Sequence, residues 1–351
     1  MQASELRQLL ADCKYQIHWS RYPMTVMVTL TSLINSSWSL LHRLVKQSTV
    51  EQTRIEKPPV FIVGHWRSGT TLTHELMSRD KNLAFPSNYD AFVPSHFLVS
   101  APLVKWPVKM LLPRKRPFDN MNIDVDYPQE DDFALMAMGA VSYYRRFGFP
   151  DQQDSFIELL DSETLSAEQR QKLANCISVF FQSLTHRSGR QLVLKSPPHT
   201  ARIGLLRELF PNAKFVHISR HPYKVVPSTM RLWAISDKIH GFHLPRYSDE
   251  ALMQHIAKTK SAMYHAYQRD REQLPDNQLI EISFESLIEN PASTIESVYG
   301  QLELPGVGDV IDSTKQYFEE RKSHKQNKHS YDHLRDQIDS DWSDYMQLFG
   351  Y

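Results

Sequence analysis

The stretch PPVFIVGHWRSGTTL, residues 58–72, is the most informative segment of this chain. Its apolar run from Val60 to Val63 predicts a buried strand, and the residues from Thr70 onward can begin a helix. A loop bounded by Gly64 and Gly69 lies between the two. Backbone N–H groups in such a loop point at an anion, and the helix dipole adds positive potential there. The order of strand, loop and helix therefore predicts a site for a phosphate group.

The loop departs from the common phosphate-binding pattern G-x-x-x-x-G-K-[S/T] at one position. The spacing from Gly64 to Gly69 fits, but Thr70 stands where the lysine is expected, and Arg67 lies inside the loop. Without the lysine that reaches the outer phosphates, a conventional nucleoside triphosphatase is disfavoured. Arg67 can instead grip a phosphate with two N–H groups at once. Taken alone, the same glycines also fit an ordinary turn that binds no ligand.

Two later segments place basic side chains at the ends of predicted strands. Residues 214–219 read as a buried strand that is followed by Arg220, and Ser228 lies eight positions later on a predicted helix. Residues 191–194 read as another strand, and Lys195 ends it. Because ligands of parallel sheets bind beyond the carboxyl ends of the strands, these side chains are expected to gather near the loop.

Together, these motifs resemble the sulfotransferases that use 3′-phosphoadenylyl sulfate (PAPS). The R-S-G-T-T sequence at residues 67–71 resembles their 5′-phosphosulfate-binding loop, and Arg220 with Ser228 resembles their 3′-phosphate motif. Lys195 resembles the strand-end lysine near the transferring sulfuryl group in tyrosylprotein sulfotransferases and related enzymes. The motifs occur in the family's order over residues 58–233, and residues 280–291 extend the likeness.

The resemblance implies roles for these residues. Arg67 and Lys195 are expected to stabilise charge during sulfuryl transfer, and no metal is required. Many sulfotransferases place a C-terminal basic loop over the 3′-phosphate, and the basic run at residues 321–328 is a candidate for it, although such a run is also typical of a solvated face. The residues expected to bind the PAPS donor are Arg67, Ser68, Gly69, Thr70, Thr71, Arg220, Ser228 and Lys325.

The general base has two candidates. The glutamate that tyrosylprotein sulfotransferases carry soon after the first helix has no counterpart in residues 85–90. His199 lies four residues beyond Lys195 and has a suitable ordinary pKa, but it also fits a helix-entry histidine bonded to backbone. Glu130 opens a predicted helix, where a carboxylate also compensates the dipole. The sequence leaves both open, with Asp90, His96 and Asp131 in reserve.

Length and composition favour one globular enzyme domain. The chain has 351 residues, and its 40 basic and 40 acidic residues cancel, which disfavours nucleic acid and other polyanionic partners. Two cysteines fit a reducing, cytoplasmic compartment. The expected fold is α/β, a parallel sheet flanked by helices. We expect residues 57–305 to form the nucleotide-binding core, residues 1–56 a helical extension, and residues 306–351 a C-terminal basic loop and helix.

Further elements follow from periodicity and capping. Residues 278–282 are expected to form another strand, and residues 70–78, 130–139, 166–187 and 223–233 to form helices. Ser166 with Gln169 is typical of a helix N-terminus. The seven prolines of residues 85–128 disfavour long helices and central strands there. Such an irregular excursion over a nucleotide site usually shapes a substrate pocket.

Residues 22–41 carry no formal charge and are long enough to span a bilayer, although their many Ser and Thr residues disfavour a span. The apolar stripe Met27, Leu30, Ile34, Trp38, Leu41 and Val45 favours an amphipathic helix packed on the core. A membrane-surface helix comes second and a true span third. Residues 103–116 also mix apolar and cationic side chains, which fits either peripheral membrane contact or the wall of an acceptor site.

The acceptor is the least determined part of the function. Neutral charge and the apolar, proline-rich excursion favour a hydrophobic or amphiphilic alcohol, which includes a small molecule, a lipid or a glycan. Two other classes stay open: an atypical kinase that uses ATP and magnesium, and a non-catalytic scaffold that binds nucleotide or lipid. The missing loop lysine argues against the kinase. The presence of Lys195, Glu130 and His199 argues against the scaffold.

Overall fold

The computed structural model describes residues 1–111, 124–320 and 334–351. The chain divides into two compact units, each of which is described by itself. Unit 1 comprises residues 1–56, 85–189 and 232–248, and unit 2 comprises residues 57–84, 190–231 and 249–351. The predicted division into one domain with extensions at both ends stays a prediction.

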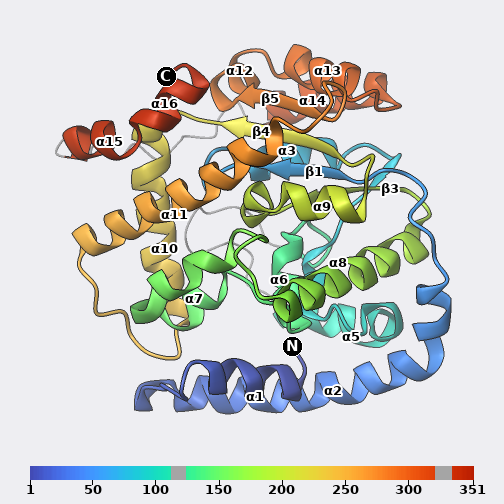
Figure 1. Cartoon of the computed structure of the whole chain (residues 1–351). Helices are drawn as coiled ribbons and strands as arrows, with labels where there is room; N and C mark the ends of the chain where they lie inside the picture. The colour runs from blue at the N-terminus through green and yellow to red at the C-terminus, as the bar shows by residue number, and fades with distance from the viewer. Residues whose placement is uncertain (112–123, 321–333) are drawn as a thin grey trace. The chain divides into compact units, whose positions relative to one another are not determined.

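Unit 2 contains a five-stranded parallel sheet with the strand order β2-β3-β1-β4-β5 (Figure 1). The central strands are continuous apolar runs because both faces of the sheet are covered. The four predicted strands are confirmed to within one or two residues, and the two-residue strand β2 was not predicted. The strands are β1 (Val60–Val63), β2 (Leu83–Ala84), β3 (Gln191–Lys195), β4 (Lys214–Ser219) and β5 (Leu279–Ser283).

Helices flank this sheet, so the predicted α/β fold class is confirmed. The helix α3 begins directly after the loop at residues 64–69 and packs on β1 and β3. The helix α10 (Pro222–His240) begins in unit 2, and its residues from Leu232 onward belong to unit 1. The other helices of unit 2 are α3 (Thr70–Met77), η3 (Pro197–Ala201), α9 (Ile203–Leu209), α11 (Asp249–Arg271), α12 (Phe284–Glu289), α13 (Pro291–Gln301), α14 (Val307–Glu320), α15 (Arg335–Asp341) and α16 (Ser343–Phe349).

Unit 1 is helical in its described residues. Ser166 and Gln169 form a reciprocal capping box at the start of α8, as predicted. The predicted helix near residues 130–139 is also present as α6. The helices of unit 1 are α1 (Ala3–Asp12), η1 (Trp19–Arg21), α2 (Tyr22–Glu51), α4 (Asn88–Phe92), α5 (Phe97–Leu111), α6 (Asp131–Ala137), α7 (Arg145–Gly148), η2 (Pro150–Leu159) and α8 (Ala167–Ser188).

The prolines of residues 85–128 are expected to disfavour a long helix there, and this expectation is wrong. The helix α5 has 15 residues and contains Pro102 and Pro107. Each proline removes one backbone hydrogen bond and leaves a carbonyl without its helical partner. Both prolines are exposed, so water can satisfy the carbonyls on that side. The exposed position of the prolines therefore makes the helix tolerable.

The interpretation of α2 as a helix whose apolar stripe packs on the core is also wrong. Five residues of the stripe, Met27, Leu30, Ile34, Leu41 and Val45, are exposed, and only Trp38 is half-buried, where it stacks on His96. Ser32, Ser39 and His42 are buried instead. The small polar side chains of the inner face allow close packing, and some of them form hydrogen bonds there. The Oγ atom of Ser36 accepts from the backbone N–H of Ala3 at 2.9 Å. The apolar residues thus share one face of the helix, as predicted, but most of that face is exposed to solvent rather than packed on the core.

Candidate active site

The loop after β1 has a backbone that requires its glycines. Gly64 has φ of +138° and Gly69 has φ of +115°, and a Cβ atom on Gly69 would lie 2.4 Å from the ring of Phe284. Arg67 also has a positive φ, at +66°. The N–H of Gly64 donates to the Oγ1 atom of Thr200 at 2.8 Å, which anchors the start of the loop. No motif around Thr200 predicts this role.

Three side chains of the predicted donor site meet directly beside this loop. The Nε atom of Arg67 donates to the Oγ atom of Ser228 at 2.8 Å, and the Nη1 atom of Arg220 donates to the carbonyl of Arg67 at 3.1 Å. We call Arg67, Arg220 and Ser228 the arginine cluster. It joins the loop, the end of β4 and the first half of α10, although its members are separated by up to 161 positions in the sequence.

The arginine cluster concentrates positive charge in a largely buried place. Arg220 lies over the ring of Phe284, with 4.1 Å between the guanidinium carbon and the ring centroid. Burial lowers the pKa of Arg220, Glu285 opposes this shift, and the neighbouring charge of Arg67 adds to it. The backbone N–H of Arg220 also donates to the hydroxyl of Tyr345 at 3.1 Å. Two close guanidinium groups favour an anion between or beside them.

Two buried polar atoms, one in the cluster and one in the loop, fit a phosphate ligand. Among the described residues, the Oγ atom of Ser68 and the Nε atom of Arg220 are buried and have no hydrogen-bond partner. Such atoms cost free energy unless a ligand or water pairs with them. The loop also leads directly into the N-terminus of α3 at Thr70. These observations are compatible with an anion held by the loop, by the helix and by the arginine cluster.

Lys195 lies at the carboxyl end of β3 and contacts the first turn of α3. Its Nζ atom donates to the Oγ1 atom of Thr71 at 3.4 Å, and only 3% of the residue is exposed. The neighbouring strand pairs Ile62 with Lys195, two residues before the loop begins. Lys195 is therefore a cation placed beside the loop.

His199 belongs to η3, shortly after β3, and is fully buried. Its ring meets the ring of Phe61 edge to face, with 5.6 Å between centroids. Phe61 stacks in turn on Phe215, so His199 borders the apolar layer beneath the sheet. This environment suits a packing role at least as well as proton transfer.

Glu130, the other candidate base, lies in unit 1. It occupies the position before the first residue of α6, where its side chain makes no cap hydrogen bond. The hydroxyl of Tyr144 donates a hydrogen bond to its carboxylate. Tyr144 stacks on Phe133, so the donor is held in place by α6 itself. Glu130 is only partly exposed and carries a polar partner, which an acceptor hydroxyl could join.

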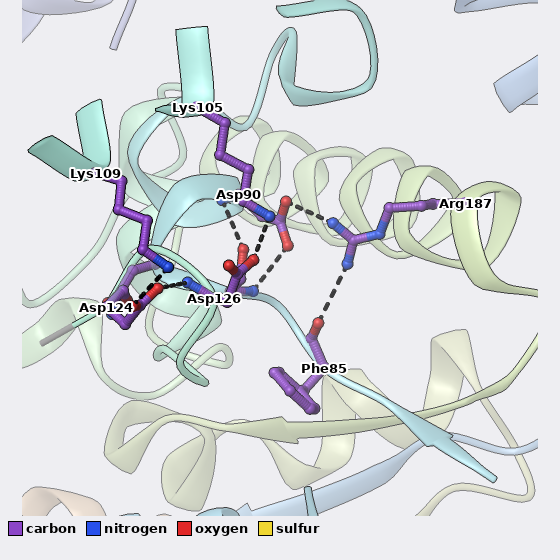
Figure 2. Close-up of polar contacts among 9 residues, drawn as sticks. Phe85, Asp90, Lys105, Lys109, Asp124, Asp126 and Arg187 are labelled. Atoms are coloured by element: carbon purple, nitrogen blue, oxygen red, sulfur yellow. Dashed lines mark hydrogen bonds and ion pairs between the residues drawn. The ribbon is translucent and has the colours of Figure 1, made fainter. Parts of the chain in front are cut away.

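The reserve candidates have structural partners. Asp90 accepts from Arg187 at 2.6 Å (Figure 2). It also accepts from the backbone N–H of Ser87 at 2.8 Å. His96 contacts the hydroxyl of Ser100 at 2.9 Å, and burial lowers its pKa to about 4. Asp131 is fully buried at the first position of α6. These contacts explain Asp90 and His96 without a catalytic role.

Trp66, within the loop, is buried and meets the ring of His65 edge to face, so it packs under the loop. Lys325 lies outside the described residues. Within the described ranges, no group of three or more His, Cys, Asp or Glu side chains could hold a metal ion. The predictions for these roles stay predictions.

The parallel sheet, the glycine loop after its central strand and the cationic side chains at the strand ends define a class. They are the features of an α/β protein that binds a nucleotide phosphate at the carboxyl edge of its sheet. The sequence model described as "Sulfotransferase family" matches residues 58–309, and the chain belongs to that family. It is therefore a transferase enzyme that takes a sulfuryl group from a sulfonate donor.

Characterised relatives and solved structures agree with this assignment. The chain is 32% identical over 345 residues to the omega-hydroxy-beta-dihydromenaquinone-9 sulfotransferase Stf3 of Mycobacterium tuberculosis and of Mycobacterium bovis, covering 98% of this chain and 88% of each relative. The crystal structure of the sulfotransferase STF9 from Mycobacterium avium superposes with a TM-score of 0.71 at 16% identity, covering 90% of this chain and 82% of that one. STF1 of Mycobacterium tuberculosis gives a TM-score of 0.59 at 16% identity over 90% of this chain and 86% of that one. At these identities, the structures support the fold alone.

Proposed function

We propose that this enzyme transfers the sulfuryl group of PAPS to the hydroxyl group of a lipid-soluble alcohol on the cytoplasmic side of a membrane. The observation that carries the donor assignment is the arginine cluster beside the glycine loop. A nucleotide with phosphates at both its 3′ and 5′ positions needs two anion sites close together. The cluster and the loop with Lys195 provide them.

For the 3′-phosphate, we assign Arg220 and Ser228. Arg220 has an unpaired, buried Nε atom, and its charge is already desolvated, so a dianion would gain strong, charge-assisted hydrogen bonds there. Arg67 bonds to Ser228 and lies within the loop, so it can contact both phosphates. AMP would lack the group that the cluster is suited to hold.

For the 5′ end, we assign the backbone from Ser68 to Thr71 together with Lys195. PAPS supplies a sulfuryl group attached to a phosphate that leaves as the group is transferred. The N–H groups at the start of α3 can hold that phosphate, and its negative charge is favoured by the helix dipole. Lys195, held by Thr71, can neutralise charge on the sulfuryl oxygens. Lys325 stays a candidate for the 3′-phosphate.

We propose a lipid-soluble alcohol as the acceptor because of the similarity of this chain to the sulfotransferase Stf3. That enzyme is named for a hydroxylated dihydromenaquinone, and it matches nearly the whole of this chain at 32% identity. The proposed acceptor is accordingly an apolar molecule with one accessible hydroxyl group. A small soluble acceptor or a glycan would contradict this part of the proposal.

The general base is assigned to Glu130, with His199 as the alternative. Full burial of His199 against Phe61 favours Glu130, whose carboxylate is partly exposed. The variants Glu130→Gln and His199→Ala should be compared at saturating PAPS, with nucleotide affinity measured alongside. The true base should lose turnover by about 10²–10⁴-fold while donor binding stays nearly intact. If both variants retain turnover, both assignments are wrong.

The direct test of the proposed function is transfer of label to a panel of acceptors. The enzyme is incubated with PAPS labelled in its sulfur and with an isoprenoid alcohol, a phenol or a hexose, each in detergent micelles. Label should appear in the isoprenoid alcohol and be lost in the Lys195→Ala variant. Transfer only to the phenol or the hexose would refute the lipid acceptor. Transfer of phosphate from ATP with magnesium would refute the donor.

A further inference from the structure

The helix α2 carries a continuous row of apolar side chains that its own unit leaves exposed. Their exposed fractions run from 41% to 77%, and they fall within an arc of roughly 140° when successive residues turn by about 100°. In Figure 1, α2 lies along one edge of unit 1. We call these residues the outer row: Tyr22, Val26, Met27, Leu30, Leu33, Ile34, Leu40, Leu41, Leu44 and Val45.

Charge is excluded from the outer row but present near its ends. No acidic or basic residue occurs from Tyr22 to Leu41, and the polar positions within or beside the arc carry only hydroxyl groups, as at Thr29, Thr31 and Ser37. Arg21 precedes the helix, and Arg43 and Lys46 lie in its last turns before its single acidic residue. A wide apolar row that carries no charge along its length suits the interfacial region of a bilayer.

The inner face of α2 holds the helix against its own unit along its length. Ser32, Ser39 and His42 are buried there. The side-chain amide of Asn35 donates to the carbonyl of Met1 at 3.2 Å, and its oxygen contacts the Nε2 atom of His96 at the same distance. The helix Trp19–Glu51 is long and apolar enough to cross a membrane. If α2 crossed a membrane, these contacts would break, whereas they stay intact if the helix lies flat on the membrane surface.

The neighbouring helix α5 has the same character. It packs on α2 and exposes Leu103, Trp106, Met110 and Leu111. Its two lysines do not lie free: Lys105 pairs with Asp126, and Lys109 pairs with Asp124 at 2.9 Å (Figure 2). Trp19, just before α2, is also exposed, and tryptophan prefers the headgroup region of a bilayer.

We propose that the outer row of α2 docks this enzyme flat on the surface of a lipid bilayer, with α5 as a second contact. A second copy of the chain fits the row less well. A coiled-coil seam is narrower than this arc and is flanked by charged pairs, whereas hydroxyl side chains flank the outer row. A bilayer needs no complementary shape and accepts a wide apolar strip. The inference rests on unit 1 alone and does not require the proposed acceptor to be correct.

The test uses the full chain and vesicles made of equal parts of phosphatidylcholine and phosphatidylglycerol. The variant Leu30→Ser/Ile34→Ser/Leu41→Ser changes the centre of the outer row. Its control, Val179→Ser/Ile239→Ser/Ile288→Ser, removes three exposed aliphatic side chains that lie outside α2 and α5. In flotation assays, the wild type and the control should bind, and the outer-row variant should bind about 10²-fold more weakly. Equal binding of all three proteins, or of none, would overturn the proposal.

Two further measurements separate the remaining occupants and orientations. Light scattering without vesicles gives the oligomeric state. If the wild type is a dimer that does not bind vesicles and the outer-row variant is a monomer, the row belongs to an interface with a second copy of the chain. For orientation, Ser20→Cys and Gln47→Cys place thiols near the two ends of α2. A membrane-impermeant maleimide added outside the vesicles should label both positions. Labelling of one position alone would show a span and overturn flat docking.

Discussion

Replacing Arg220 with alanine should reduce the affinity for a nucleotide that carries a 3′-phosphate and leave the affinity for one without it nearly unchanged. Arg220 is largely buried, stacks on Phe284 and bonds to the carbonyl of Arg67. These contacts fix the guanidinium where the proposed 3′-phosphate binds. The substitution should therefore weaken the binding of 3′-phosphoadenosine 5′-phosphate far more than the binding of AMP.

The magnitude follows from the contacts that Arg220 has available. A hydrogen bond to a charged group contributes about 1.5–3 kcal/mol, and the buried Nε atom of Arg220 is unpaired among the described residues. A bidentate contact, with some discount for solvent, gives about 3 kcal/mol, or about 10²-fold in Kd. The free energy of unfolding without ligand should change by no more than about 1 kcal/mol. Loss of the contact with Phe284 is offset because a desolvated charge beside Arg67 is removed.

Titration calorimetry with both nucleotides provides the assay. Lys315→Ala is the charge-matched control, because this side chain in the same unit is 62% exposed. That control should leave both affinities within about threefold. Equal affinity of the wild type for the bisphosphate and for AMP, or an equal loss for both in Arg220→Ala, would refute the assignment of the cluster.

Three further predictions concern catalysis, the loop and pH. Lys195→Ala should bind 3′-phosphoadenosine 5′-phosphate normally but lose turnover by about 10²–10³-fold, and a chelator should leave the wild-type rate unchanged; strict magnesium dependence would contradict this. Gly69→Ala should lower the free energy of unfolding by about 1–3 kcal/mol in denaturant titrations, because its Cβ atom would meet the ring of Phe284 at 2.4 Å, whereas Gly300→Ala in open space should be neutral or slightly stabilising. Burial lowers the pKa of His65 to about 4 and that of His217 to about 3. Below the ordinary histidine pKa of about 6.5, the unfolded chain therefore binds more protons than the folded protein. Stability should accordingly be level above about pH 6.5 and fall as the pH drops towards 4, and His217→Phe should reduce that slope by about one proton; a flat profile would count against this.

The strands and the places of the motifs could be predicted because their signals are local. An uninterrupted apolar run determines β1, and the residues that follow it determine the loop and α3. Lys195 and Arg220 were expected at strand ends, and the structure places them at or directly after those ends. The contacts between distant segments could not be predicted in detail. Nothing near Thr200 or Tyr345 indicates that they hold Gly64 and Arg220.

The helices α2 and α5 show the limit of reasoning from periodicity. The spacing of Leu30, Ile34 and Leu41 shows that they share one face, but it does not show whether that face is buried. Here small polar side chains such as Ser32 and Ser39 pack inward, and the apolar face is left outside. Propensity likewise disfavours a helix through Pro102 and Pro107, although their exposed positions make one possible. In both cases, the decisive fact is the direction of a side chain in the tertiary structure.

A crystal structure of the enzyme with 3′-phosphoadenosine 5′-phosphate would test the central claim most directly. The 5′-phosphate should accept hydrogen bonds from the backbone N–H groups of residues 68–71, with Lys195 beside it. The 3′-phosphate should contact Arg220 and Ser228. A nucleotide bound away from the glycine loop, or bound there with its 3′-phosphate directed to solvent, would contradict the account.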